Sequence, residues 1–285
     1  MKLSAVRAKV RSKRALSVRV PLLALGAALA CLEFAPDDAA GLVGDAPLAT
    51  DDIARAVVGI VGPHNSFCTA TAIASEMLLT AGHCVQPGVS YRVQFKDGNG
   101  QRQYSEIVDM DRPPQFRELA PGRSPLADLA LVKVGEPFPA HIGIATLGLT
   151  QPPIWPGDRV IVIGGGIPFR GLHETGVNRE ATLVATGPYA PLQMWLTDAS
   201  GRFKGACLGD SGAPVFQVQP EGAKVVGVVG WASGPNKTKG CGGMTGATPL
   251  SPYRAWIEGT MGRFGGTAQV GHRRERLALH TLREG

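Results

Sequence analysis

Hydrophobic residues along this chain fall mainly into short runs that polar and turn-forming positions separate. Residues 91–95 alternate between apolar and polar side chains, which is the pattern of a strand with one buried face. Residues 56–61 form a continuous apolar run, as in a fully buried strand. A hairpin signal, Lys-Asp-Gly-Asn-Gly, stands at 96–100. Further strand signals lie at residues 69–73, 77–80, 129–134, 158–163, 181–184, 193–196, 213–216 and 225–229.

Few stretches depart from this strand pattern. Residues 253–258 give the one good helical signal, after the last strand. Residues 31–52 are small, acidic and without a period, so we interpret them as a linker. A proline-rich stretch at 136–156 separates two groups of strands, which we place at residues 53–140 and 141–260. With 38 glycines and 22 prolines, this pattern predicts an all-β protein.

The formal net charge of +6 comes from the N-terminal segment. Residues 1–30 hold seven basic residues and no acidic one, and they end in an apolar run with an Ala-x-Ala sequence. This is the pattern of a secretory signal peptide, and the run is too short to span a bilayer comfortably. Without it, 22 basic residues face 23 acidic ones, so the charge predicts no nucleic-acid partner. The basic stretch at 261–285 is interpreted as a solvated terminus, with a surface-binding tail as the alternative.

Five cysteines accompany this export signal, which predicts an oxidising compartment and disulfides. Four of them lie in the body of the chain, and three pairings of the four are possible. The fifth, Cys31, directly follows the Ala-x-Ala sequence. It is either a residue at the cleavage site or the lipid-modified first cysteine of a bacterial lipoprotein, and only the second case predicts membrane attachment.

Three short segments carry residues that suit nucleophilic catalysis. They are Leu-Thr-Ala-Gly-His-Cys at 79–84, Ala-Asp-Leu-Ala-Leu-Val-Lys-Val at 127–134 and Cys-Leu-Gly-Asp-Ser-Gly-Ala-Pro at 207–214. A serine hydroxyl attacks well only when a base takes its proton, and a histidine oriented by a buried carboxylate supplies such a base. In these three segments, over roughly residues 53–260, the chain resembles the chymotrypsin-like (trypsin-fold) serine peptidases. The resemblance implies a His83, Asp128 and Ser211 triad.

This resemblance also implies a fold and a mechanism. We expect two six-stranded antiparallel β-barrels with a short C-terminal helix, and an active site between the barrels. The N–H groups of Gly209 and Ser211 would form the oxyanion hole. The reaction would pass through an acyl-enzyme with a protein or peptide substrate and no cofactor, in a protein that we expect to be secreted or periplasmic and monomeric. The implied disulfides are Cys68–Cys84 and Cys207–Cys241.

The specificity pocket is read from the same resemblance. Trypsin-like members carry an Asp six residues before the nucleophile, where this chain has Gly205, followed by Ala206. Gly230-Trp231-Ala232 matches the strand that pairs with the substrate backbone, and Gly246 matches the opposite wall loosely. We therefore predict small or medium apolar side chains at P1, the substrate residue before the cleaved bond, rather than basic ones.

Two positions depart from the family pattern. Members stored as zymogens carry an Ile-Val-Gly-Gly-like sequence some 26 residues before the first cysteine, and its freed amine pairs with the Asp next to the nucleophile. Val57-Val58-Gly59 stands only about ten residues before Cys68, so we expect Asp210 to be held by another group or activation to differ. In addition, Gly230 replaces the family's usual Ser and removes a hydrogen bond near the triad aspartate.

Other classes of function find less support. The chain has no His-Glu-x-x-His and no cysteine cluster with zinc spacing, so no metal site is predicted. Gly164-Gly-Gly166 lacks the rest of a dinucleotide fingerprint and is interpreted as a flexible loop near the site. An esterase with a Gly-x-Ser-x-Gly elbow is disfavoured because Ala213 replaces the last Gly. The main alternative is a catalytically inactive homologue that binds proteins.

Overall fold

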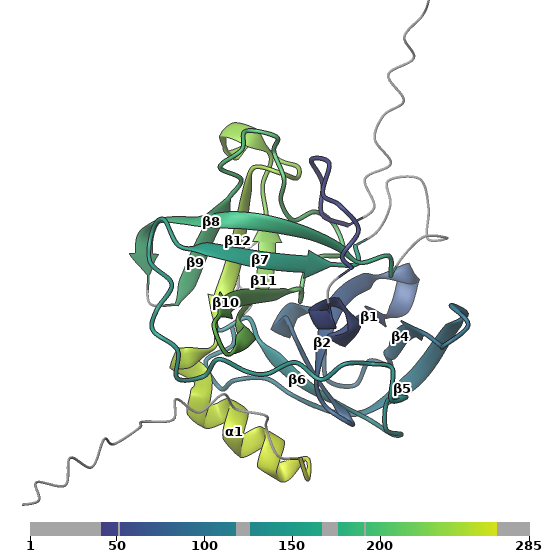
Figure 1. The fold of residues 1–285 in the computed structure, drawn as a ribbon. Helices are drawn as coiled ribbons and strands as arrows, with labels where there is room; N and C mark the ends of the chain where they lie inside the picture. The colour runs from purple at the N-terminus through teal and green to yellow at the C-terminus, as the bar shows by residue number, and fades with distance from the viewer. Residues whose placement is uncertain (1–40, 51, 118–125, 167–175, 191, 267–285) are drawn as a thin grey trace, which may run out of the picture. The chain divides into compact units, whose positions relative to one another are not determined.

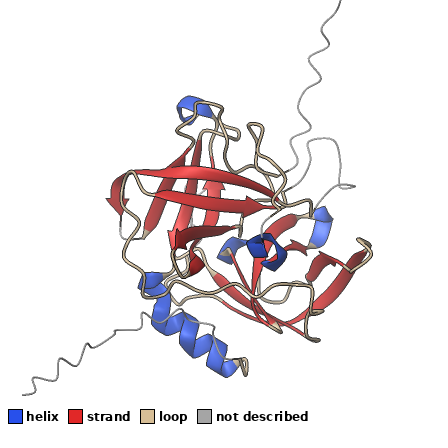
Figure 2. Ribbon diagram, in the orientation of Figure 1, coloured by secondary structure: helices blue, strands red, loops and turns tan. Residues whose placement is uncertain are grey.

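The computed structural model describes residues 41–50, 52–117, 126–166, 176–190 and 192–266. Its strands form two closed barrels of six antiparallel strands each (Figure 1). Among the described residues, helical structure is limited to short 3-10 turns and one α-helix after the last strand (Figure 2). The predicted all-β class, the two six-stranded barrels and the short C-terminal helix are therefore confirmed.

The first barrel contains six strands that close in the order β1-β2-β3-β6-β5-β4. They are β1 (Val57–Val61), β2 (Phe67–Ala74), β3 (Met77–Thr80), β4 (Arg92–Lys96), β5 (Arg102–Asp111) and β6 (Ala130–Val134). Because successive side chains of a strand point to opposite faces, Val58, Ile60, Leu78, Val93 and Val132 all pack inside this barrel.

The second barrel closes in the order β10-β11-β12-β9-β8-β7. Its strands are β7 (Arg159–Gly164), β8 (Arg179–Ala190), β9 (Gln193–Thr197), β10 (Pro214–Gln219), β11 (Gly222–Ala232) and β12 (Met244–Pro249). Val160, Val162, Leu183, Leu196 and Val215 fill its interior. The predicted proline-rich stretch separates the two sets, since β6 ends at Val134 and β7 begins at Arg159.

A third buried cluster joins the barrels to each other and to α1 (Arg254–Arg263). Leu79 and Leu131 of the first barrel, Phe216 of the second and Ile257 of α1 belong to it, and all four are fully buried. The segments that carry the predicted site leave β3, precede β6 and precede β10, so this shared core fixes the strands from which the site extends.

The carboxylate of Asp111, at the end of β5, holds the C-terminal helix. It accepts hydrogen bonds from Trp256 Nε1 at 3.2 Å and from Thr260 Oγ1 at 2.9 Å, and it pairs with the Arg263 guanidinium. Lys133 Nζ also donates to the carbonyl of Phe264 at 2.9 Å. These contacts extend the helix five residues beyond its predicted end and attach it to the first barrel.

The first described segment, residues 41–50, lies against the second barrel. Leu42 and Ala46 are buried in the interior cluster of that barrel, and Val43 donates its N–H to the carbonyl of Gly205 at 3.0 Å. This part of the predicted linker is therefore packed structure. The predicted signal peptide, Cys31 and most of the basic tail lie outside the described residues. No helix in the described part of the chain is both long and apolar enough to cross a membrane.

Candidate active site

His83 and Asp128 are brought together by neighbouring strands of the first barrel. His83 lies in the 3-10 turn after β3, and Asp128 stands two residues before the start of β6, which pairs with β3 at Thr80 and Ala130. His83 donates its backbone N–H to Asp128 Oδ1 at 2.9 Å, and its Nδ1 lies 2.7 Å from Oδ2. The short Nδ1–carboxylate contact favours the tautomer with a proton on Nδ1, which leaves a lone pair on Nε2.

The carboxylate of this pair is buried, whereas the imidazole reaches solvent. The Asp128 side chain is 2% exposed and that of His83 is 30% exposed. Gly230 of β11 packs directly on the carboxylate, because a Cβ built on Gly230 would stand 2.8 Å from Asp128 Oδ2. A serine at this position, as the family usually has, would therefore require the Asp128 carboxylate to shift.

Ser211 lies in the turn before β10, opposite the His83 turn. Thr69 of β2 donates its N–H to the Ser211 carbonyl at 2.8 Å, which ties the turn to the first barrel. The sulfur of Cys84 is 3.7 Å from that carbonyl and 3.9 Å from His83 Nε2. Within the described residues, no hydrogen bond joins the Ser211 hydroxyl to Nε2. Such contacts often tighten only when substrate binds.

The turn that carries Ser211 requires glycine at two positions, 209 and 212. Gly209 and Gly212 have φ of +86° and +89°, a region that L side chains rarely adopt. A Cβ on Gly212 would also lie 1.9 Å from the carbonyl oxygen of Thr69. The Gly209 carbonyl accepts a hydrogen bond from Thr69 Oγ1 at 2.8 Å. The N–H groups of Gly209 and Ser211 have no hydrogen-bond acceptor among the described residues, so both are free to donate to a substrate oxygen.

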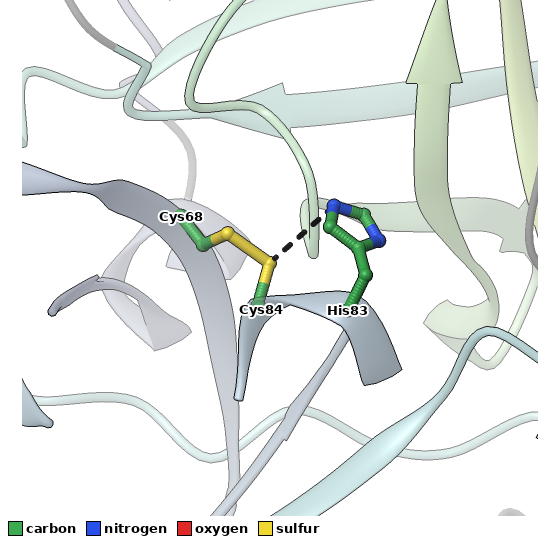
Figure 3. Close-up of side chains that lie close together, drawn as sticks. All are labelled: Cys68, His83 and Cys84. Atoms are coloured by element: carbon green, nitrogen blue, oxygen red, sulfur yellow. Dashed lines mark hydrogen bonds between the residues drawn. A yellow bond between two sulfur atoms is a disulfide. The ribbon is translucent and has the colours of Figure 1, made fainter. Parts of the chain in front are cut away.

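Both implied disulfides are present. Cys68–Cys84 attaches the His83 turn to β2, and Figure 3 shows this bridge beside the imidazole. Cys207–Cys241 attaches the start of the Ser211 turn to the segment before β12. His83 and the sulfurs of Cys68 and Cys84 form a cluster close enough to ligate a metal ion. However, a disulfide offers no thiolate, so this cluster lacks the charged sulfur ligands of a zinc site.

The predicted base of the specificity pocket carries no charge. A Cβ on Gly205 would lie 3.2 Å from Thr245 Oγ1 and 3.1 Å from the Cα of Gly242, so the space beside Gly205 is already occupied. Ala206 donates its N–H to Thr245 Oγ1 at 2.9 Å, and both residues are 1% exposed. Thr245 pairs with Ala232 across β12 and β11. Sequence reasoning did not single out Thr245, because its role depends on this cross-strand register.

Gly246, which the sequence matched loosely to the opposite wall of the pocket, lies beside Trp231. Gly246 pairs with Trp231, and a Cβ on it would lie 2.0 Å from an indole carbon of Trp231. The indole therefore covers Gly246 on the outer face of the barrel. Thr245, the neighbour of Gly246, faces Gly205 and Ala206 instead, because adjacent residues of a strand point to opposite faces.

Comparison with known proteins agrees with this geometry. A family model described as Trypsin matches residues 49–257, which is well over half of the chain. The chain belongs to the trypsin family. Curated relatives of this trypsin-family chain are 23–29% identical to it. They include "Putative trypsin-6" of Homo sapiens (23% identity, covering 85% of this chain and 98% of the relative) and "Alpha-fibrinogenase-like" of Daboia siamensis (29%, covering 67% and 76%).

Two further similarities show how diverse the named relatives are. "Lectizyme" of Glossina austeni is 23% identical and covers 71% of this chain and 80% of that protein. The solved structure titled "HUMAN HEPARIN BINDING PROTEIN" has a TM-score of 0.61 and 23% identity, and covers 79% of this chain and 99% of that one. This structural likeness shows the shared trypsin-family fold.

Asp210, the residue before the predicted nucleophile, is a fully buried carboxylate. It accepts N–H groups from Cys207 at 2.9 Å and from Gly166 at 3.1 Å. A Cβ on Gly164 would lie 2.1 Å from Asp210 Oδ1, so these glycines make room for the carboxylate. The Gly164-Gly-Gly166 stretch, which the sequence suggested as a flexible loop, therefore packs around Asp210 at the end of β7.

A second segment resembles the activation sequence of family members that are stored as zymogens. Leu42-Val43-Gly44 lies 26 residues before Cys68, the family's usual spacing, and an initial Leu hides its likeness to Ile-Val-Gly-Gly. The structure places this segment at Asp210, since a Cβ on Gly41 would be 3.6 Å from Asp210 Oδ1. In this chain the Asp210 carboxylate accepts the N–H groups of Cys207 and Gly166, so a group other than a freed amine holds it, as one of the two expectations had it.

Burial gives Asp210 an unusual titration in this uncleaved chain. Desolvation raises its pKa from 3.8 to about 7, against the lowering effect of the Cys207 and Gly166 N–H groups. Between about pH 4 and pH 7 the folded protein therefore holds one proton more than the unfolded chain, and rising pH favours unfolding.

We expect the free energy of unfolding to fall by roughly 4 kcal/mol over this range because of Asp210, at about 1.4 kcal/mol per pKa unit. Urea titrations at several pH values will measure it. Asp210→Asn should flatten this part of the pH profile, and an unchanged slope in that variant would contradict the assignment to Asp210.

Proposed function

We propose that the protein is a serine endopeptidase with His83, Asp128 and Ser211 as its catalytic triad. The observation that carries this proposal is the 2.7 Å contact between His83 Nδ1 and the buried Asp128 carboxylate. His83 Nε2 lies 3.9 Å from the Cys84 sulfur, which is itself 3.7 Å from the Ser211 carbonyl oxygen. Family membership supports the same reaction class. A buried carboxylate that orients a half-exposed imidazole is the arrangement that activates a serine hydroxyl.

The proposed reaction has two stages. Ser211 Oγ attacks the peptide carbonyl while His83 Nε2 takes its proton, and the resulting imidazolium gives that proton to the departing amine. This leaves an acyl-enzyme ester on Ser211. Water then attacks the ester with His83 again as base, which releases the acid and restores the hydroxyl. Asp128 stays ionised and stabilises the imidazolium at each stage.

The oxyanion of each tetrahedral intermediate would be held by the N–H groups of Gly209 and Ser211. Both are unpaired in the described structure, and Gly209 has the positive φ that this turn requires. Donors held in place before the reaction stabilise the charge that develops in the transition state. Each such donor raises the rate about 10²–10³-fold. No cofactor takes part in the proposed steps.

A test of the nucleophile uses a fluorophosphonate, which labels activated serines, on residues 42–285 and on the matched Ser211→Ala variant. We expect labelling of the first and none of the second, with equal circular dichroism. Thr69→Ser, which keeps the hydroxyl on the Gly209 carbonyl, serves as a folded control that should label. If neither protein with Ser211 labels, the alternative of a non-catalytic, protein-binding trypsin homologue is favoured.

We further propose a P1 preference for small or medium apolar side chains. Gly205 puts no carboxylate at the base of the specificity pocket, and the side chains of Thr245 and Ala232 make the pocket narrower. An unpaired guanidinium or ammonium there would lose its hydration without compensation. We expect kcat/KM for Arg or Lys at P1 to be at least ~10²-fold below that for Ala or Val. A peptide library will measure this, and Ala232→Gly should shift preference toward Phe.

The cellular setting is part of the same proposal. The N-terminal pattern and the two disulfides support export to an oxidising compartment. There the protein would act on other proteins as a monomer, without nucleic acid, and with a membrane anchor only if Cys31 carries lipid. Mass spectrometry of the exported protein distinguishes an N-terminus after Ala30 from a lipid-modified Cys31.

A further inference from the structure

Thr69, on β2 of the first barrel, contacts both residues whose N–H groups are proposed to form the oxyanion hole. Its backbone N–H donates to the Ser211 carbonyl at 2.8 Å, and its hydroxyl donates to the Gly209 carbonyl at 2.8 Å. A hydroxyl has one hydrogen to donate, so that of Thr69 is committed to Gly209. One residue of the first barrel therefore holds the turn before β10 of the second barrel on both sides of Asp210.

The Gly209 carbonyl depends on this hydroxyl. In the part of the chain that the structure describes, Thr69 Oγ1 is its only hydrogen-bond donor, and Gly209 is buried. A buried carbonyl that loses its donor turns toward another partner, because an unpaired polar group is costly. Glycine permits such a rotation more readily than other residues. The orientation of the Gly209 N–H must therefore be maintained by a contact from outside the turn.

The hydroxyl is itself fixed in place. Thr69 is 0% exposed, its Oγ1 accepts the Gly165 N–H at 3.3 Å, and its carbonyl accepts the Thr80 hydroxyl at 2.8 Å. Cys68, its neighbour on β2, is bridged to Cys84 (Figure 3). Because the hydroxyl accepts one hydrogen bond and donates another, its direction is set before any substrate arrives. Such preorganisation is what a transition-state donor needs.

We propose that Thr69 is a positioning residue of the oxyanion hole, whose hydroxyl keeps the Gly209 N–H aimed at the substrate oxygen by holding the Gly209 carbonyl. The inference rests on the proposed peptidase function and adds a residue to it. Thr69 acts through Gly209 rather than on the reacting atoms. Because an oxyanion donor stabilises the transition state more than the bound substrate, its misalignment should lower kcat and leave KM nearly unchanged.

Thr71 offers a matched control on the same strand, two residues further along. Its side chain is also 0% exposed, but its hydroxyl has no hydrogen-bond partner among the described residues. Replacing Thr by Val removes a hydroxyl and keeps the branched shape that suits a strand. Thr69→Val and Thr71→Val therefore make the same chemical change, with and without loss of a hydrogen bond. Thr69→Ser keeps the hydroxyl and tests for rescue.

These three variants and the parent are assayed with a p-nitroanilide peptide that has Ala at P1, and for the rate of fluorophosphonate labelling. In Thr69→Val we expect kcat and the labelling rate to fall about ten- to a hundredfold, part of the effect of one donor, with KM within about twofold. Thr69→Ser and Thr71→Val should both stay within about threefold of the parent in kcat.

Rates are referred to the folded fraction of each protein, measured by circular dichroism. If Thr69→Val does not fold, Thr69→Ala, which removes the hydroxyl and leaves more space, takes its place. A Thr69→Val protein with the kcat of the parent overturns the proposal and leaves the triad intact. An equal loss in Thr71→Val, or a change confined to KM, also overturns it, because either would show a general effect of the strand.

Hydrogen exchange separates this proposal from the peptidase proposal. If the parent neither cleaves the peptide nor reacts with the fluorophosphonate, the peptidase proposal fails, but the contact can still be tested. The amides of Asp210, Gly212 and Ala213 are hydrogen-bonded in this turn. Faster exchange of these amides in Thr69→Val alone supports the positioning role of the hydroxyl. Equal exchange in all four proteins overturns it.

Discussion

Asp128→Asn should lower kcat about 10⁴-fold, because an amide in place of the carboxylate favours the wrong imidazole tautomer. In the native site the carboxylate accepts a hydrogen bond from His83 Nδ1–H at 2.7 Å and one from the backbone N–H of His83 at 2.9 Å. The amide NH₂ would instead donate to Nδ1 and place the proton on Nε2, where the imidazole can no longer act as a base toward Ser211. Steady-state hydrolysis of the best P1 peptide measures the loss.

Asp109→Asn offers a matched control for this change. Asp109 lies on the same barrel, in β5, but it is exposed and accepts only the neighbouring backbone N–H of Met110. The activity of the Asp109→Asn variant should stay within twofold of the activity of the parent protein. Above pH 10, hydroxide can take the Ser211 proton in place of His83, so part of the activity of the Asp128→Asn variant should return. A variant that had lost activity through misfolding would not recover in this way. An Asp128→Asn enzyme of full activity would remove Asp128 from the triad.

Cutting the chain directly before Leu42 should raise kcat/KM by up to about 10²–10³-fold, because a new ion pair would hold the Gly209 and Ser211 donors more firmly in place. The cut creates an ammonium at Leu42, beside the buried Asp210 carboxylate that Gly41 already approaches. An ion pair there would lower the pKa of Asp210 and fix the turn that carries Gly209 and Ser211. A foreign site-specific cleavage sequence inserted before Leu42 lets the same sample be assayed before and after the cut.

The Asp210→Asn variant controls for this experiment, since the new ammonium would then lack its partner. The kcat/KM of this variant should remain, after the cut, at the value of the uncleaved protein. Cleavage should also abolish the fall in stability between pH 4 and 7, because Asp210 would no longer take up a proton there. Equal activity before and after cleavage would mean that the N–H groups of Cys207 and Gly166 alone hold Asp210 in its working position.

Much of the fold could be predicted from period-2 patterns, and β5 shows where those patterns end. Its residues, Arg102–Asp111, are mostly exposed and carry few apolar side chains, so no alternation marked them as a strand. The strand exists because β4 and β6 offer hydrogen-bonding edges on both sides of it. The tertiary structure, rather than local hydrophobicity, thus determines this element.

The candidate site, like the fold, could be predicted from the sequence only in part. The resemblance of three motifs, in their order, to the trypsin-fold peptidases predicted which residues form the proposed triad. In the structure β3 and β6 pair within one barrel, and β10, which follows Ser211, belongs to the other. Thr245 could not be found this way, because its position beside Gly205 depends on cross-strand register. The packing of residues 41–46 could not be predicted for another reason. Their sequence is short and partly acidic like that of a linker, and only the burial of Leu42 in the second barrel and the approach of Gly41 to Asp210 distinguish it.

The placement of the two disulfides gives the site a dependence on redox potential. One bridge ends at Cys84, next to His83, and the other begins at Cys207, four residues before Ser211. In a reducing compartment both disulfides would be reduced to thiols. The turn that carries the base and the turn that carries the nucleophile would then lose their covalent attachments at the same time. On the proposed function, a chain awaiting export would lack both ties and would be inactive toward cytosolic proteins. Activity measured across a glutathione redox series should fall in one transition, and full activity under reducing conditions would refute this coupling.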